Sequence, residues 1–127
     1  MIISFKKKYN NFIMNYNNHN YYECIKAGTE IINSGYKYEQ LHIYIGNSYM
    51  MLQKYKMAID HFRNAITLNC HSLEAYYNLS IAYFEQKEYE NAEQALRNVI
   101  NINYKYIDGW NSLGHVLIKL NRTKEAK

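Results

Sequence analysis

Five histidines and two cysteines are the first side chains of this chain to consider as metal ligands or nucleophiles. The histidines do not show the spacing of an HExxH zinc motif, and the cysteines do not form a CxxC pair. One cysteine precedes a histidine, but adjacent residues on a turn rarely face each other, and the sequence shows no third group to orient them. Phosphate-binding loops of the GxxxxGK or GxGxxG type are also absent from the sequence. We therefore predict no catalytic residue, no metal site, no cofactor and no enzymatic activity. The residues considered are His19, His42, His61, His71, His115, Cys24 and Cys70.

The composition indicates one folded, helical domain. The 127 residues are 48% hydrophobic and 20% charged, which argues against a disordered chain. There is no proline and there are only 5 glycines, so the chain lacks the turn residues of an all-β fold. The acidic residues Glu85, Glu88, Glu90 and Glu93 are expected around a turn and a helix start, where carboxylates favour the helix dipole and stay solvated.

Charge, hydropathy and cysteine content limit the location and the partners. No apolar run reaches the roughly 18 residues that would span a membrane. Two cysteines without close spacing fit a reducing, intracellular compartment, and we expect the cytoplasm. The net charge is +4, and the basic run at residues 6–8 offers only three lysines, so we do not expect a nucleic acid partner.

The positions of small and apolar residues repeat along the chain with a period of about 34 residues. Small residues recur in two registers, at Gly46, Ser80 and Gly114 and at Ala58, Ala92 and Ala126. Large apolar residues follow the same period, as at Ile45, Leu79 and Leu113 and at Tyr49, Tyr83 and Leu117. A fixed period of this length indicates stacked copies of one structural unit.

Within one period the apolar spacing is helical and predicts a pair of helices. The clearest unit has helices at about residues 73–86 and 89–101, with Ser72 as the N-cap of the first. The short polar link at 87–88 requires the two helices to be antiparallel neighbours. We expect the paired helices of the successive units to make their closest contacts at small residues, namely Gly46, Ala58, Ser80, Ala92 and Gly114.

These residues resemble the tetratricopeptide repeat family. Its motif places an aromatic residue before Leu-Gly, then a Tyr, an Ala and a large apolar residue. The matching residues are His42, Ile45, Gly46, Tyr49, Ala58 and Phe62 in one unit, Tyr76, Leu79, Ser80, Tyr83, Ala92 and Leu96 in the next, and Trp110, Leu113, Gly114, Leu117 and Ala126 in the last. Cys70 and Tyr104 replace the closing proline, and His42, in the usual Trp position, is expected to be packed and not a ligand.

The resemblance implies an all-α solenoid of antiparallel helix pairs, with about three repeats and a degenerate N-terminal unit. We expect a basic, Asn-rich segment with a possible helix at 1–20, followed by the repeat domain at 21–127. That domain divides into a degenerate second helix at 21–38, repeats at 39–72 and 73–106, and an incomplete repeat at 107–127, whose second helix would contain Lys127. In the N-terminal unit the Leu-Gly pair falls on Asn11-Phe12 and is lost.

The family's first helices line a concave groove that binds proteins, and the resemblance implies the same role here. A scaffold or adaptor that binds a peptide or helix of a partner protein is therefore the expected function. Helix geometry leaves nine residues free to face this groove, namely Tyr44, Asn47, Met51, Tyr77, Asn78, Ile81, Asn111, Ser112 and His115.

One subset of the family binds the C-terminal carboxylate of a chaperone with two Lys, two Asn and an Arg. Those positions hold Ile43, Asn47, Asn78, Asp108 and Ser112 here, so we expect no carboxylate clamp. Two alternatives remain open. The repeats could be the N-terminal targeting or dimerisation region of a longer enzyme or assembly, or the incomplete last repeat could mediate self-association.

Overall fold

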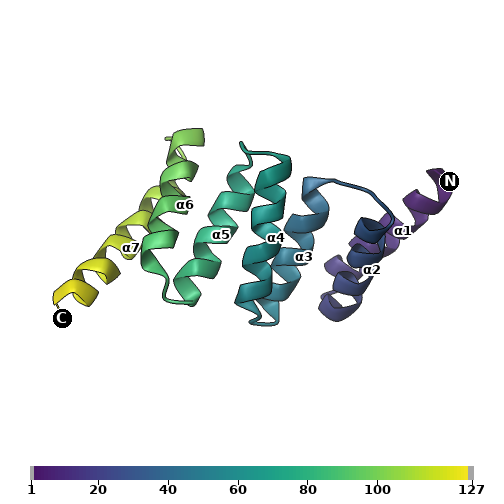
Figure 1. Cartoon of the computed structure of the whole chain (residues 1–127), viewed down its shortest axis with the longest axis horizontal. Helices are drawn as coiled ribbons and strands as arrows, with labels where there is room; N and C mark the ends of the chain where they lie inside the picture. Colours follow the sequence, from purple (N-terminus) through teal and green to yellow (C-terminus); the bar gives the residue numbers. More distant parts are fainter. Residues whose placement is uncertain (1, 126–127) are drawn as a thin grey trace.

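The chain folds into a single row of α-helices. The computed structural model describes residues 2–125, which contain seven helices and no strand. The helices follow one another from one end of the molecule to the other, and the two ends of the chain lie at opposite ends of the row (Figure 1). They are α1 (Ile2–Asn17), α2 (Tyr21–Asn33), α3 (Glu39–Met51), α4 (Tyr55–Leu68), α5 (Leu73–Glu85), α6 (Tyr89–Ile102) and α7 (Ile107–Glu125).

The first six helices form three antiparallel pairs that share one type of turn. His19, Gln53 and Lys87 connect the helices of each pair and occupy the same position in successive periods, with φ angles of 63°, 59° and 62°. In each turn the next backbone N–H donates to the carbonyl five residues earlier, at 2.8–2.9 Å. The N-terminal pair therefore closes in the same way as the other two, although its sequence departs from the motif.

The predicted helix pair at 73–101 is confirmed to within one residue at each end. Helix α5 begins at Leu73, and the Ser72 side chain accepts a hydrogen bond from the N–H of Ala75 at 3.3 Å, as an N-cap does. The partner helix α6 begins at Tyr89, as expected.

Small residues lie where the paired helices are closest. A Cβ atom on Gly46 would lie 2.5 Å from the ring of Phe62, which is itself fully buried. The side chains of Ala58 and Ala92 are also fully buried, and Ser80 is 2% exposed. At these positions the predicted tight contacts are confirmed, because a larger side chain would separate the helices.

The N-terminal pair reaches the same packing by exchanging the large and the small residue. Phe12 on α1 stands one period before Gly46, and Gly28 on α2 stands one period before Phe62. A Cβ atom on Gly28 would lie 2.7 Å from the Phe12 ring. The aromatic ring therefore comes from the first helix here and from the second helix in the next pair. This exchange explains why the Leu-Gly pair of the motif fails at Asn11-Phe12.

The C-terminal part of the chain differs from the prediction. We expected the repeat at 107–127 to reach a second helix that contains Lys127, but the first helix, α7, runs without a break from residue 107 to residue 125. Residues 121–125 carry no apolar side chain that could pack back against α7, so a turn there would gain no buried surface. The predicted register position Ala126 lies outside the described residues.

The tight contact predicted at Gly114 is therefore wrong. Nothing lies within 4 Å of a Cβ atom built on Gly114, and the residue is exposed. The reason is that no helix among the described residues covers this face of α7. The same register position is closed at Gly46 only because α4 folds back over it.

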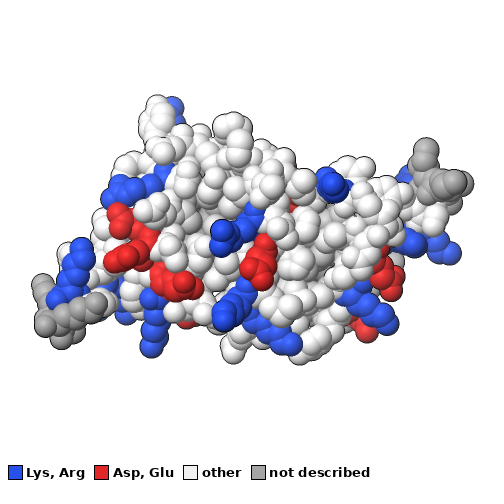
Figure 2. All heavy atoms as spheres, viewed as in Figure 1, with Lys and Arg blue, Asp and Glu red and all other residues white. Residues whose placement is uncertain are grey.

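Buried side chains form a core that continues along the row of helices. One cluster joins the first three helices around Phe12, Ile31 and Leu41, and another joins α4, α5 and α6 around Phe62 and Leu79. A further cluster joins α6 to α7 through Leu96, Leu113, Val116 and Leu120. On the face drawn in Figure 2, acidic and basic side chains are interspersed, and no charge of one sign dominates it.

Candidate functional site

Two cavities lie along the first helices of the pairs, where the sequence predicts a groove. The N-terminal pocket has a volume of about 260 Å³ and is lined by Tyr16, Tyr21, Asn47, Met50, Met51, Asn78 and Ile81. The C-terminal pocket has a volume of about 340 Å³ and is lined by Ser80, Ile81, Phe84, Leu96, Ser112, His115 and Val116. Ile81 belongs to both pockets, so they are adjacent.

The two pockets are related by the sequence repeat. Asn47, Met50, Asn78 and Ile81 line the first, and the residues one period later line the second, namely Ile81, Phe84, Ser112 and His115. The molecule therefore carries two copies of one type of site. The copies differ in polarity, because Ile81 replaces Asn47 and Ser112 replaces Asn78.

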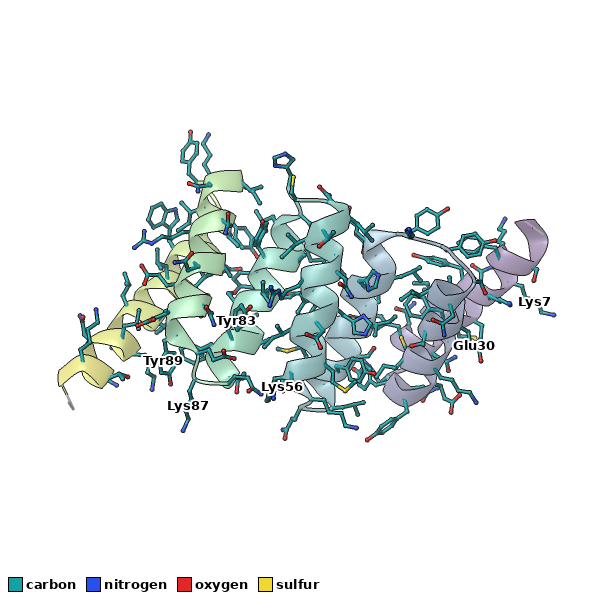
Figure 3. The ribbon with its side chains drawn as sticks, viewed as in Figure 1. Lys7, Glu30, Lys56, Tyr83, Lys87 and Tyr89 are labelled. Atoms are coloured by element: carbon teal, nitrogen blue, oxygen red, sulfur yellow. The ribbon has the colours of Figure 1, made fainter. Side chains whose placement is uncertain are left out.

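The floor of the C-terminal pocket is part of the core between α6 and α7. Leu96 and Val116 line the pocket and belong to that cluster, where they are almost fully buried. Tyr83 and Tyr89, which are labelled in Figure 3, pack against the same cluster. A packed floor keeps the pocket in shape before any ligand is present, which lowers the entropic cost of binding.

Hydrogen bonds connect polar side chains across the N-terminal pocket. The Asn78 amide donates to the Asn47 carbonyl oxygen at 2.9 Å, and the Asn47 amide donates to the Tyr16 hydroxyl at 3.2 Å. These bonds fix the orientation of both asparagines and link α5, α3 and α1. Each amide group has further donor or acceptor positions that remain available to a ligand.

Neither pocket is lined by a charged side chain. Burial raises the pKa of the Tyr16 hydroxyl above its usual value, although the hydrogen bond from Asn47 opposes this, so the group is neutral at neutral pH. Two of the positions that form the carboxylate clamp in one subset of the family line neither pocket here. Ile43 is fully buried in the core, and Asp108 is exposed on α7.

The structure brings most of the predicted groove residues together. Asn47, Met51, Asn78 and Ile81 line the N-terminal pocket, and Ile81, Ser112 and His115 line the C-terminal pocket. The two predicted tyrosines lie beside the pockets. Tyr44 packs against the ring of Tyr16 with 4.6 Å between centroids, and the Tyr77 hydroxyl lies 3.3 Å from the Ser112 hydroxyl. Asn111 lines neither pocket and is exposed.

One register position that contributes to both pockets is not among the predicted groove residues. Tyr16, Met50 and Phe84 are each one period apart, and each lines a pocket. Their spacing could have identified them as one set. These three residues are aromatic or apolar and lie close to core residues in the sequence. The apolar pattern alone therefore does not show that they line a pocket and do not belong to the core.

Two histidines and one cysteine lie in the packed interior of the helix stack. His42 is packed as predicted, with 9% of its surface exposed, and its Nδ1 lies 3.1 Å from Nδ1 of His61. Cys24 is buried, and burial raises the pKa of its thiol, which makes the thiolate less accessible. Within residues 2–125 no three His, Cys, Asp or Glu side chains gather in a way that could hold a metal ion. None of the helices in that part of the chain is long and apolar enough to cross a membrane.

The antiparallel helix pairs, the common turn and the repeated pockets define an α-helical repeat protein. Residues 39–69 and residues 73–106 each match the tetratricopeptide repeat, and together these matches cover just over half of the chain. The chain belongs to the tetratricopeptide repeat family.

Solved structures of the same fold are similar over most of the chain. The first tetratricopeptide repeat of Spaghetti (RPAP3), bound to the HSP90 peptide SRMEEVD, is 20% identical with a TM-score of 0.84, over 94% of this chain and 92% of that chain. The Yersinia enterocolitica type III secretion chaperone SycD, in complex with a peptide of the translocator YopD, is 11% identical with a TM-score of 0.85, over 91% and 94%. The protein MamA is 24% identical with a TM-score of 0.77, over 84% of this chain and 58% of that chain. None of the curated proteins matches the sequence.

Proposed function

We propose that this chain is a protein-interaction scaffold that binds a segment of a partner protein along its two repeated pockets. The observation that carries this proposal is the repetition of one pocket at the spacing of the sequence repeat, with Ile81 shared between the copies. A ligand that enters both pockets must be elongated, as a peptide segment is. The complexes of Spaghetti and SycD with peptides support the proposal, because they have the same fold.

The lining of the pockets favours a segment with uncharged, apolar side chains. Met50, Met51 and Phe84 offer apolar contact area, and methionine adapts to different ligand shapes. Asn47 and Asn78 offer amide groups that can bond to the peptide backbone. An acidic C-terminal segment would find no Lys or Arg in either pocket, and a buried carboxylate without a partner is costly. We infer that the partner segment presents apolar residues and is not recognised through a terminal carboxylate.

Selection from a phage-displayed library of random peptides would test this function. We expect the selected peptides to share apolar residues and to lack a requirement for a free C-terminal carboxylate. Their affinity would then be measured by fluorescence anisotropy for the wild type and for Ile81→Asp, which places a charge in both pockets. We expect at least a roughly tenfold loss of affinity for this variant, equivalent to about 1.4 kcal/mol.

Leu68→Asp is the matched control, because Leu68 is exposed on α4 and lines neither pocket. Circular dichroism would show whether both variants remain folded. Equal affinities of the wild type and Ile81→Asp for the selected peptides would refute this groove as the binding site. The peptide SRMEEVD serves as a second probe, and binding as strong as that of the selected peptides would refute the proposed preference for uncharged segments.

A further inference from the structure

Helix α7 presents a stripe of apolar side chains that no described residue covers. Ile107, Trp110, Leu117 and Ile118 are 71%, 51%, 38% and 49% exposed. Spacings of three, four and seven residues place them on one face of the helix together with Gly114. An adjoining face, with Leu113, Val116 and Leu120, packs against α6. Such a stripe on a single exposed helix indicates a surface for another protein.

Gly114 stands at the centre of this stripe and leaves room for close approach. Its backbone requires no glycine, because it lies inside a helix and nothing lies within 4 Å of an added Cβ atom. A glycine at such a site costs about 1 kcal/mol of helix stability relative to alanine when nothing packs on it. At the equivalent Gly46, the neighbouring helix places the Phe62 ring where a Cβ atom would be. The stripe on α7 therefore has the shape of a face that takes another helix.

The arrangement of the stripe about Gly114 suits a second α7 in the opposite direction. When two antiparallel copies of α7 cross at Gly114, each residue before the glycine in one copy faces the residue equally far after the glycine in the other copy. Trp110 then faces Ile118 of the second copy, so an aromatic ring meets an aliphatic side chain. The contact is self-complementary, as a two-fold symmetric interface requires.

The charges on α7 favour the same direction. In the antiparallel pair Asp108 comes level with residue 120 of the second copy, about 3 Å along the axis from Arg122. Both residues are exposed on the same flank of the helix. In a parallel two-fold pair the same flank of the two helices lies on opposite sides of the interface, and Asp108 is about 21 Å along the axis from Arg122 of the second copy, so these two charges cannot pair.

We propose that the exposed face of α7 binds a second copy of this chain in an antiparallel, two-fold symmetric dimer centred on Gly114. None of the residues of the stripe lines either pocket, so the dimer would leave the pockets free and would join two binding grooves. One pair of helices buries less than the roughly 1,200–2,000 Å² of a standard stable interface, so we expect a weak dimer, on the order of micromolar Kd.

Sedimentation equilibrium of the full chain over a dilution series tests the proposal. The wild type is expected to move from the mass of one chain to that of two as its concentration rises. Gly114→Leu adds a side chain in open space, so the monomer stays folded while the two helices can no longer meet. We expect its dimer Kd to rise at least roughly tenfold. Gln94→Leu introduces a leucine at an exposed position of α6 and should leave the Kd unchanged.

A charge exchange tests the direction of the helices. Asp108→Arg and Arg122→Asp should each weaken the dimer, and the double variant should restore it, because the opposite charges meet again. A wild type that stays monomeric up to about 1 mM would overturn the proposal. A dimer that Gly114→Leu leaves intact would place the contact on another face and overturn it equally. Failure of the double variant to restore association would overturn the antiparallel arrangement.

Discussion

At the scale of single residues, one register position shows how a covering helix decides the role of a glycine. Gly46 and Gly114 occupy the same register position in different repeats, but only Gly46 has a neighbouring ring against it. Phe62 is fully buried, so its ring would have to shift within the core to admit a Cβ atom. The position of a glycine in the repeat therefore does not by itself predict whether the packing requires it.

Substitution of these two glycines by alanine should change stability in opposite directions. Gly46→Ala places a Cβ atom 2.5 Å from the Phe62 ring, so we expect it to lower the free energy of unfolding by about 1–3 kcal/mol. Gly114→Ala meets nothing and gains helix propensity, so we expect an increase of about 0.5–1 kcal/mol. Urea unfolding at low protein concentration, where any dimer is dissociated, measures both. Effects of the same sign would contradict the packing described here.

Two histidines at the contact of α3 and α4 form the main titrating group of the core. Nδ1 of His42 and Nδ1 of His61 lie 3.1 Å apart, and Tyr49 stacks on the His61 ring with 5.6 Å between centroids. Burial lowers the pKa of His61 to about 4, and the nearby His42 contributes to this shift while Asp60 opposes it. Burial also lowers the pKa of His42. The pair therefore shares one hydrogen bond in its neutral form.

The protein should lose stability as the pH falls from about 6.5 towards 4. In the unfolded chain His61 takes up a proton near its ordinary pKa of about 6.5, whereas in the folded chain it does so only near 4. Below pH 6.5 the unfolded state therefore binds more protons, and the free energy of unfolding should fall by about 2–3 kcal/mol across this range. Urea unfolding at several pH values measures the slope. His61→Asn keeps a polar group without titrating and should show a smaller slope; identical slopes would argue against a role for this pair.

At the scale of elements, the turns inside the three helix pairs use residues in a left-handed conformation. Gln53 and Lys87 have positive φ angles that cost a non-glycine residue about 1 kcal/mol. We expect Gln53→Gly and Lys87→Gly each to raise the free energy of unfolding by about 0.5–1 kcal/mol. Asn121→Gly is the matched control. Asn121 stands one period after Lys87 but lies inside α7, so glycine there should be slightly destabilising. Thermal unfolding compares the three variants, and destabilisation by the first two would contradict the assigned turn geometry.

The sequence predicted the elements best where local signals and packing agree. Helix α5 has a capping serine, a regular apolar pattern and a covering partner, and its predicted start is correct. The N-terminal pair was only partly predicted, because Phe12 and Gly28 exchange places across the two helices, and such an exchange cannot be read from one helix alone. The continuation of α7 to residue 125 was missed because the repeat period alone does not show whether the residues after a first helix can pack back against it.

The candidate site was predicted less completely than the fold. The polar residues Asn47, Asn78 and Ser112 were identified because they do not belong to the apolar registers. Tyr16, Met50 and Phe84 were missed because an apolar side chain in a pocket and one in the core have the same helical spacing. Only the packing of neighbouring repeats separates the two cases.

At the scale of the whole molecule, each helix contacts mainly its neighbours in the row. The stability of such a stack is approximately a sum of the units and the contacts between neighbours. Among the helices of residues 2–125, α3 to α6 have a neighbour on both sides of the row, whereas α1 and α7 stand at its ends with a neighbour on one side. The ends of the stack should therefore open more easily than its middle.

Amide hydrogen exchange should show this gradient directly. We expect the slowest exchange in α4 and α5 and the fastest helical exchange in residues 121–124 of α7, whose side chains are all exposed. If α7 binds a second copy, its protection should also rise with protein concentration, while the protection of α1 should not. Gly114→Leu should remove this concentration dependence and leave the gradient unchanged. Exchange that is equally slow in all seven helices would show that the stack opens as one cooperative unit, because each end would then unfold only together with the centre.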